Sequence, residues 1–314
     1  MQKILSVAGP TASGKTGLSI ALAKKWNGEV VSCDSMQIYK GMAIGTAAPT
    51  AEEMDGIPHH LIGICSPDDT FSAAEWTALA RQCIDAISAR GKLPILCGGT
   101  GLYLDSLTKI SQFSENTGDS SVREELQQIA EVQGAEVLHK MLSEIDPEAA
   151  EAIHPNNVKR VIRAIEIYRV TGMTKTETDK LQTAGNSLYR EFRLILTYQN
   201  RDVLYERIDR RVGLMLDAGL LEEAKALYDS CSQTGTARQA IGYKELLPYF
   251  QGLCSLEEAA DQIRQSSRRY AKRQITWFKR GSGYPLVMDN ADGSMRSLSE
   301  LLDEIEQAAK EADF

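Results

Sequence analysis

The sequence has few cysteines and histidines and contains no long hydrophobic run. Its 314 residues include 6 cysteines and 4 histidines, and no Cys-x-x-Cys pair occurs. This pattern argues against a disulfide framework and against a zinc site. No apolar stretch approaches the roughly 20 residues that a membrane-spanning helix needs, so we expect no membrane association. Because an apolar strand is predicted as early as Ile4, there is no room for a signal peptide, and we expect a cytoplasmic protein.

The chain also lacks an excess of positive charge. It carries 35 lysines and arginines against 43 acidic residues, a net charge of −8, which argues against a protein that coats nucleic acid. Basic residues nevertheless gather in three short segments, and such clusters indicate either a selective RNA surface or solvated helix faces. The clusters are Arg268, Arg269, Lys272, Arg273, Lys279 and Arg280; Lys159, Arg160, Arg163 and Arg169; and Arg207, Arg210 and Arg211.

A glycine-rich segment near the N-terminus has the spacing of a phosphate-binding loop. It follows the apolar run Ile4–Ala8 and precedes a run with helical spacing at Leu18–Ala23. A strand, a tight turn and a helix start leave several backbone N–H groups aimed at one point, where they bind phosphate oxygens. The lysine adds a positive charge, and the final hydroxyl can hold Mg²⁺. The loop consists of Gly9, Pro10, Thr11, Ala12, Ser13, Gly14, Lys15 and Thr16.

Strands and helices alternate in the first third of the chain. Short apolar runs predict strands at residues 4–8, 30–33, 61–64 and 93–97, and helices over 18–26 and 73–90. This alternation is typical of a parallel sheet wrapped by helices. Later runs predict strands at 192–197 and 285–288, and a helix over 201–228 that is broken at Gly219. We therefore predict an α/β fold, a P-loop NTPase-like parallel sheet flanked by helices.

A long helical pattern interrupts this core. A polar stretch at 114–121 predicts a loop, and residues 121–168 then have an almost wholly helical pattern. We predict a helical insertion domain at 115–190 within a core formed by residues 1–114 and 191–314.

Asp34 directly follows the predicted second strand, whereas the strand at 93–97 has no acid at its end. Most proteins with this loop hydrolyse a nucleotide or transfer its phosphoryl group, and they need a second carboxylate for the metal ion. Asp34 is placed at the carboxyl end of a buried parallel strand, where sites in such sheets form. The residue is therefore either an acid–base group or an aspartate that orders the following loop.

Four segments, in this order, resemble the bacterial tRNA dimethylallyltransferases, also called tRNA isopentenyltransferases. They are the loop 9–16, Asp-Ser-Met-Gln-Ile-Tyr at 34–39 with Gly-Thr-Ala at 45–47, Gly-Gly-Thr-Gly-Leu-Tyr at 98–103, and Ala-Lys-Arg-Gln-Ile-Thr-Trp-Phe at 271–278. The resemblance extends from about Ile4 to about Arg280. It implies transfer of a dimethylallyl group from dimethylallyl diphosphate to the exocyclic N6 amine of the adenosine directly 3′ of the anticodon. Pyrophosphate leaves, and the family prefers tRNAs that read codons starting with U.

The resemblance implies catalytic roles around the donor. Lys15, together with Mg²⁺ held by Thr16, would stabilise the negative charge on the leaving pyrophosphate. Asp34 would be the general base for the amine proton, and Thr100 would add a hydroxyl contact. In the family an arginine of the segment at 207–211 reaches the diphosphate. Arg207 and Arg211 share a helix face, and their spacing does not tell which one does so.

The resemblance also implies a tRNA partner whose target adenosine is flipped out of the anticodon loop. Arg123 could equally be a solvated arginine and Tyr243 a core aromatic residue. Lys272 and Arg273 are assigned no catalytic role, and we expect a monomer. The predicted tRNA-contacting residues are Asp34, Ser35, Met36, Gln37, Thr100, Arg123, Lys159, Arg160, Val161, Ile162, Arg163, Gln239, Gly242, Tyr243 and Lys244.

Three other interpretations of the loop remain open from the residues themselves. A small-molecule kinase would use ATP at the same loop, but the metal-binding acid that it needs is not evident. A nucleotide-regulated RNA-binding module would not require Asp34. A purely structural protein would leave the phosphate loop unexplained.

Overall fold

The computed structural model describes residues 1–108, 120–184, 187–230 and 236–314. These form two compact units, a core unit of Met1–Thr108 and Tyr189–Phe314, and a helical unit of Lys109–Leu188. The sequence had placed the insertion at 115–190. The loop predicted at 114–121 falls almost entirely outside the described residues.

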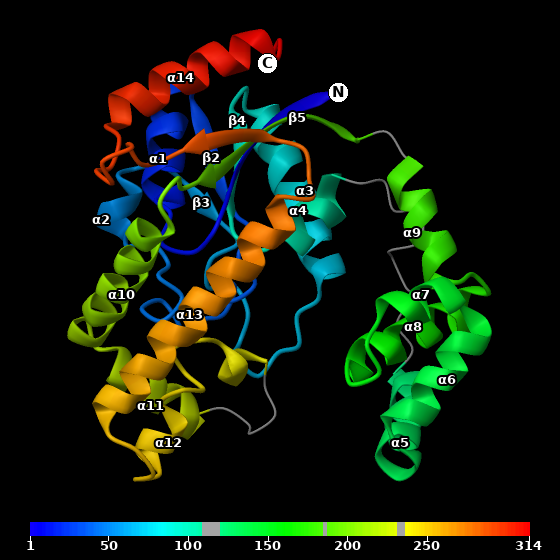
Figure 1. The fold of residues 1–314 in the computed structure, drawn as a ribbon. Helices are drawn as coiled ribbons and strands as arrows, with labels where there is room; N and C mark the ends of the chain where they lie inside the picture. Colours follow the sequence, from blue (N-terminus) through cyan, green and yellow to red (C-terminus); the bar gives the residue numbers. More distant parts are fainter. Residues whose placement is uncertain (109–119, 185–186, 231–235) are drawn as a thin grey trace. The chain divides into compact units, whose positions relative to one another are not determined.

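The core unit is built on one parallel sheet of six strands in the order β3-β2-β4-β1-β5-β6 (Figure 1). Parallel sheets need helices on both faces, because crossover connections run over each side. The predicted α/β class is confirmed. The strands are β1 (Gln2–Ala8), β2 (Gly28–Ser32), β3 (His59–His60), β4 (Leu93–Gly98), β5 (Tyr189–Thr197) and β6 (Tyr284–Val287).

Different helices cover the two faces of this sheet, because alternate residues of each strand point to opposite sides. Leu5 and Val7 of β1 pack into a cluster with α1 and α14. Ile4 and Ala8 pack into a second cluster with α3 and α4. The bounds of these helices are α1 (Lys15–Lys25), α3 (Ala73–Ala89), α4 (Gly101–Thr108) and α14 (Leu298–Glu311).

The third strand is shorter than predicted, and the prediction of a strand at 61–64 is wrong. Only His59 and His60 pair with β2. Leu61 and Gly63 adopt φ angles of 62° and 61°, and this left-handed backbone cannot continue a pleated strand. The N–H groups of Gly63 and Ile64 instead donate to carbonyl oxygens of residues 37 and 38. The segment therefore supports the loop that follows β2.

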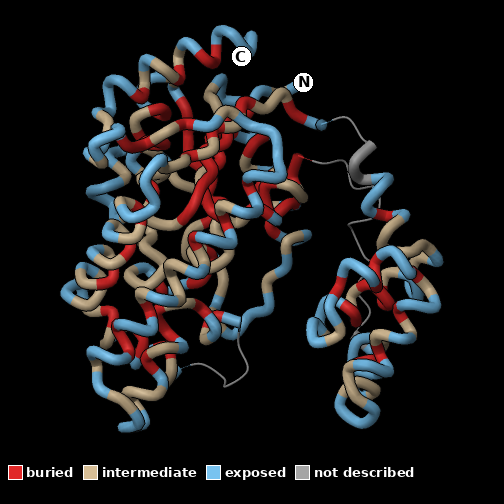
Figure 2. The backbone as a smooth tube through the Cα atoms, in the orientation of Figure 1, coloured by how far each residue is buried: buried red, intermediate tan, exposed pale blue. Residues whose placement is uncertain are grey.

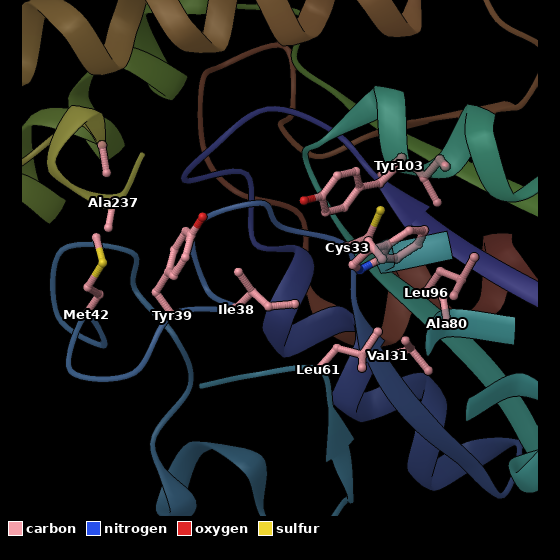
Figure 3. Close-up of a cluster of buried hydrophobic side chains, with 14 of the residues drawn as sticks. Val31, Cys33, Ile38, Tyr39, Met42, Leu61, Ala80, Leu96, Tyr103 and Ala237 are labelled. Carbon is pink, nitrogen blue, oxygen red and sulfur yellow. The ribbon is translucent and has the colours of Figure 1, made fainter. Parts of the chain in front are cut away.

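Figure 3 shows the interior beneath that loop. Ile38, Tyr39 and Met42 belong to the same buried cluster as Val31 and Leu96 of the sheet. The loop that carries Asp34 is thus anchored by its own apolar residues.

The remaining elements of the core unit follow β5 in the chain, except for a short helix after β2. The predicted break at Gly219 is confirmed, because one helix ends before it and another begins after it. The elements are α2 (Ala51–Met54), α10 (Arg201–Asp217), α11 (Leu220–Ser230), a 3₁₀ turn (Ala237–Gln239), α12 (Leu247–Phe250) and α13 (Leu256–Phe278). Among the described helices none is long and apolar enough to cross a membrane.

The helical unit has an interior of its own, visible as a separate set of buried residues in Figure 2. Leu126, Leu138, Leu142, Val161 and Ile165 are all fully buried there. Its helices are α5 (Ser120–Gln133), α6 (Ala135–Ile145), α7 (Pro147–Ala152), α8 (Val158–Thr171) and α9 (Lys175–Ala184).

Candidate active site

The phosphate loop joins β1 to α1 at the carboxyl edge of the sheet. Residues 11–16 line a cavity of about 320 Å³, which we call the loop cavity. The end of β4 contributes Cys97 and Gly98 to the same cavity, and the residue after Cys33 contributes Asp34. Three strand ends therefore converge on one point, as expected for a site in an open parallel sheet.

Three cations lie against the loop. Lys15 Nζ donates to the Pro10 carbonyl oxygen at 2.6 Å. Arg207 Nε donates to the Ala12 carbonyl oxygen at 2.9 Å, and an Arg211 guanidinium nitrogen donates to Thr11 Oγ1 at 3.0 Å. Both arginines line the loop cavity. The structure therefore does not distinguish the two arginines as candidates for the diphosphate contact.

Burial and neighbouring charges shift the pKa of Lys15. Burial, together with the nearby Arg211, lowers the pKa of its ammonium group to about 8, and Asp34 acts in the opposite direction. Burial likewise lowers the pKa of the Arg211 guanidinium. An anion in the loop cavity would favour the charged form of both groups.

Asp34 uses one carboxylate oxygen to order its own loop. Its Oδ1 accepts hydrogen bonds from the N–H groups of Met36 at 2.9 Å and Gln37 at 3.4 Å. The other oxygen accepts no hydrogen bond from the residues that the structure describes. The two interpretations of Asp34 are therefore compatible, because the loop-ordering contact leaves Oδ2 available for a proton.

A second cavity, of about 260 Å³, adjoins the first, and we call it the inner cavity. It is lined by apolar side chains of α10 and α13, among them Ile208, Met215 and Ile263, and by Ser35 and Met36. Asp34 lines both cavities. The residues common to both are Thr11, Asp34, Thr46, Arg211 and Tyr270.

Glu223 of α11 joins two segments that form the wall of the inner cavity, and the sequence did not single out this residue. Its carboxylate accepts hydrogen bonds from the N–H groups of Ile44 and Gly45, both at 2.9 Å, and from the Tyr243 hydroxyl at 2.6 Å. A Cβ at Gly45 would lie 2.5 Å from the Tyr243 ring, so only glycine fits. One carboxylate of α11 thus holds two loops together, and no local pattern around Glu223 indicates this.

The residues predicted to contact tRNA at 239–244 lie in two different environments. Gln239, Gly242 and Lys244 line the inner cavity. Tyr243 is fully buried, and hydrogen bonding to Glu223, after burial, raises the pKa of its hydroxyl. The Tyr243 side chain is therefore a core aromatic, which is the alternative that the sequence left open, and the tRNA contact of this residue stays a prediction.

Thr100 lies beside the loop that carries Asp34. Its Oγ1 accepts a hydrogen bond from the Ser35 N–H at 3.1 Å. Tyr270 of α13, a second residue that sequence reasoning missed, interacts with the Thr100 side chain. The available signal was its position directly before the segment 271–278, four residues and so about one helical turn before Gln274.

The donor atoms near Thr16 suit a hard cation. Thr16 and Asp34 line the same cavity, and hydroxyl and carboxylate oxygens are ligands that Mg²⁺ accepts. Within the described part of the chain no group of three or more His, Cys, Asp or Glu side chains could hold a metal ion.

The basic cluster of the helical unit forms around a buried acid. Glu166 is fully buried, and its carboxylate pairs with Arg123 at 2.6 Å and with Arg163 at 2.7 Å. Together with Lys159, these arginines line an open hollow between α5 and α8. Arg160 is exposed on the same helix but does not line the hollow.

Two residues of this helix that were predicted to contact tRNA are mostly buried, although Ile162 also lines the hollow between α5 and α8. Val161 is fully buried, and Ile162 is 7% exposed. Both pack into the interior of the helical unit. The helical period of 3.6 residues turns these two inward while their charged neighbours face outward.

A doubly wound parallel sheet with a Gly-x-x-x-x-Gly-Lys-Thr loop at the end of β1 defines a phosphate-loop protein of the α/β class. The chain belongs to the IPP transferase family, whose model matches residues 37–281. It is 52% identical over 278 residues to the tRNA dimethylallyltransferase of Bacillus subtilis, covering 88% of each chain. The identity to the corresponding enzyme of Bacillus cytotoxicus is also 52%, over 88% of this chain and 87% of that one.

Solved structures agree with this assignment. The full-length tRNA isopentenylpyrophosphate transferase of Bacillus halodurans is 45% identical, with a TM-score of 0.70 over 100% of this chain and 98% of that chain. A eukaryotic dimethylallyltransferase acting on tRNA is 32% identical, with a TM-score of 0.81 over 98% of this chain and 78% of that one. The fold predicted from the sequence and the predicted family are both confirmed.

Proposed function

We propose that this protein is a tRNA dimethylallyltransferase. It transfers a dimethylallyl group from dimethylallyl diphosphate to the N6 amine of the adenosine directly 3′ of the anticodon, in tRNAs that read codons starting with U. The observation that carries this proposal is the position of Asp34, which lines both the loop cavity and the inner cavity. A donor diphosphate in the first and an adenine in the second would meet at this carboxylate.

The loop cavity would hold the diphosphate. Backbone N–H groups at the start of α1, with Lys15, Arg207 and Arg211, would oppose the negative charge that grows on the leaving oxygen. Mg²⁺, bound through Thr16, would supply further charge neutralisation. These groups are already held on the loop by hydrogen bonds, so little reorganisation is needed at the moment of reaction.

The inner cavity would receive the adenine. As the new bond forms between N6 and C1 of the prenyl group, the bond between C1 and the diphosphate oxygen breaks, and its electron pair leaves with pyrophosphate. The amine proton would pass to Asp34, whose Oδ1 stays occupied by the Met36 N–H. The apolar side chains of α10 and α13 would exclude water from the reacting carbon.

The tRNA would reach this cavity with its adenosine flipped out of the loop. The helical unit offers Arg123, Lys159, Arg160 and Arg163 as phosphate contacts, which position an RNA without reading its sequence. We further propose that the enzyme is cytoplasmic and acts as a monomer on each tRNA.

A single assay separates this function from a kinase. The protein is incubated with Mg²⁺, unmodified tRNA and either dimethylallyl diphosphate or ATP. We expect prenylated adenosine and one pyrophosphate per transferred group with the first donor, and no ADP with the second. ADP formation without prenylated adenosine would overturn the proposal, and so would tRNA binding with neither product.

The basic cluster of the helical unit gives a separate prediction. Changing Lys159, Arg160 and Arg163 together to glutamine should weaken tRNA binding by about 1 kcal/mol per residue and lower the salt slope by about one per lost contact. Donor affinity should not change, because the donor site lies in the core unit. Titration of tRNA at several salt concentrations measures both effects.

Lys140→Gln is the matched control for that triple variant. Lys140 is exposed on α6 and does not line the hollow of Arg123, Lys159 and Arg163. Its replacement should change the salt slope little. If the triple variant behaves like this control, the cluster is a solvated helix face, and the RNA contacts lie elsewhere, in the segment 268–280 first.

A further inference from the structure

The Gln274 side chain connects three segments that are far apart in the sequence. Its Oε1 accepts a hydrogen bond from the Thr11 N–H of the phosphate loop at 2.8 Å, across 263 residues of chain. Its Nε2 donates to the Gly99 carbonyl oxygen at the end of β4, at 3.0 Å. Gln274 is only 4% exposed. Both ends of a buried amide are therefore hydrogen-bonded, one to the phosphate loop and the other to the residue that follows β4.

The amide fills the space beside Gly99, and the helix that carries it is well packed. A Cβ at Gly99 would lie 2.0 Å from Gln274 Nε2. The amide therefore occupies space that is open only because residue 99 has no side chain. Ala271, three residues earlier on α13, is fully buried against Leu204 and Ile208 of α10. The helix is thus packed firmly, and the amide is presented to the loop from a rigid element.

Thr11 is held from two sides by this arrangement. Gln274 holds its backbone N–H, and Arg211 donates to its hydroxyl. Because that N–H is already used, the anion would be received by the N–H groups further along, at the start of α1. These two contacts, of which the one from Gln274 comes from a buried amide, favour the clamped conformation of the loop.

We propose that Gln274 is a positioning residue that clamps the phosphate loop in the conformation that receives the donor diphosphate. It acts through Thr11 and Gly99 and takes part in no bond change. The inference rests on the proposed binding of the diphosphate at this loop. It assigns α13 a role in the donor site, in addition to its contribution to the wall of the inner cavity.

The first test is Gln274→Met, which keeps the length and volume of the side chain and removes both hydrogen bonds. Affinity for Mg²⁺-pyrophosphate, measured by calorimetry without turnover, should fall about tenfold to a hundredfold, the range expected for one buried donor left unpaired. The KM for dimethylallyl diphosphate should rise in parallel. The affinity for tRNA should stay close to that of the wild-type protein, which a general loss of packing would not allow.

The second test disturbs the position of the Gln274 amide by changing the neighbouring residue Gly99. Gly99→Ala places a methyl group where Gln274 Nε2 lies and should reproduce the loss of pyrophosphate affinity without changing Gln274. Gly213→Ala in α10 is the matched control, because no atom lies within 4 Å of the added Cβ. In the Gln274→Met background, Gly99→Ala should add little, since a flexible methionine can yield and the clamp is already lost.

The outcomes distinguish this inference from the proposed function. If the wild-type protein binds no pyrophosphate, the assignment of the loop to the diphosphate is wrong. If the wild-type protein binds it and Gln274→Met binds it equally well, the clamp is wrong while the proposed function stands. Full additivity of Gly99→Ala and Gln274→Met would also overturn the clamp, because the two changes would then act separately.

Discussion

Asp34→Ala is expected to slow prenyl transfer by about two to four orders of magnitude, the usual contribution of a general acid or base. Donor affinity should change little, because the diphosphate is held by the phosphate loop. Single-turnover measurements with rapid quenching report the chemical step directly. In steady-state measurements, slow product release could hide a slower chemical step, and single-turnover measurements are free of this effect.

Asp34→Asn separates the two roles of this residue. The amide oxygen can still accept the hydrogen bonds from Met36 and Gln37 that Asp34 Oδ1 accepts, so the loop should keep its conformation. A neutral amide cannot take the amine proton. We expect Asn and Ala to be similarly slow. A single-turnover rate in Asp34→Asn above a tenth of the wild-type rate would remove Asp34 from the role of general base.

Lys15→Ala is expected to reduce kcat/KM for dimethylallyl diphosphate by about two to three orders of magnitude, as for loss of a preorganised group at a developing anion. The charge attracts the bound diphosphate and acts more strongly on the leaving pyrophosphate, where negative charge grows, so both affinity and rate should fall. The affinity for tRNA should be kept. Lys25→Ala, at the exposed end of the same helix, is the control and should have nearly wild-type kinetics.

The same lysine predicts a pH dependence. Its pKa is lowered to about 8, so the charged form is complete well below pH 8 and is lost as the pH rises through that value. Pyrophosphate affinity of the wild-type protein should therefore fall above pH 8, and Lys15→Ala should lose this dependence. Loss of tRNA binding in Lys15→Ala, with pyrophosphate binding intact, would mean that the loop serves a different ligand.

Much of the donor site is local in sequence and was predictable for that reason. A strand, a glycine-rich turn and a helix start form a phosphate site from consecutive residues, whatever surrounds them. The break at Gly219 and the start of α3 at Ser72, whose side chain accepts a hydrogen bond from the Glu75 N–H, are equally local. Four short segments in order were enough to identify the family.

The sequence by itself therefore determined the class of fold, the glycine-rich loop between β1 and α1 and the presence of an acid at the end of β2. Tertiary structure decided which side chains are turned inward, as for Tyr243 and Val161. It also decided which distant groups hold the site, as for Glu223 and Gln274. The physical reason is that helical period and turn chemistry act over a few residues. The contact of Gln274 with Thr11 spans 263 residues and exists only once α13 has packed beside the phosphate loop.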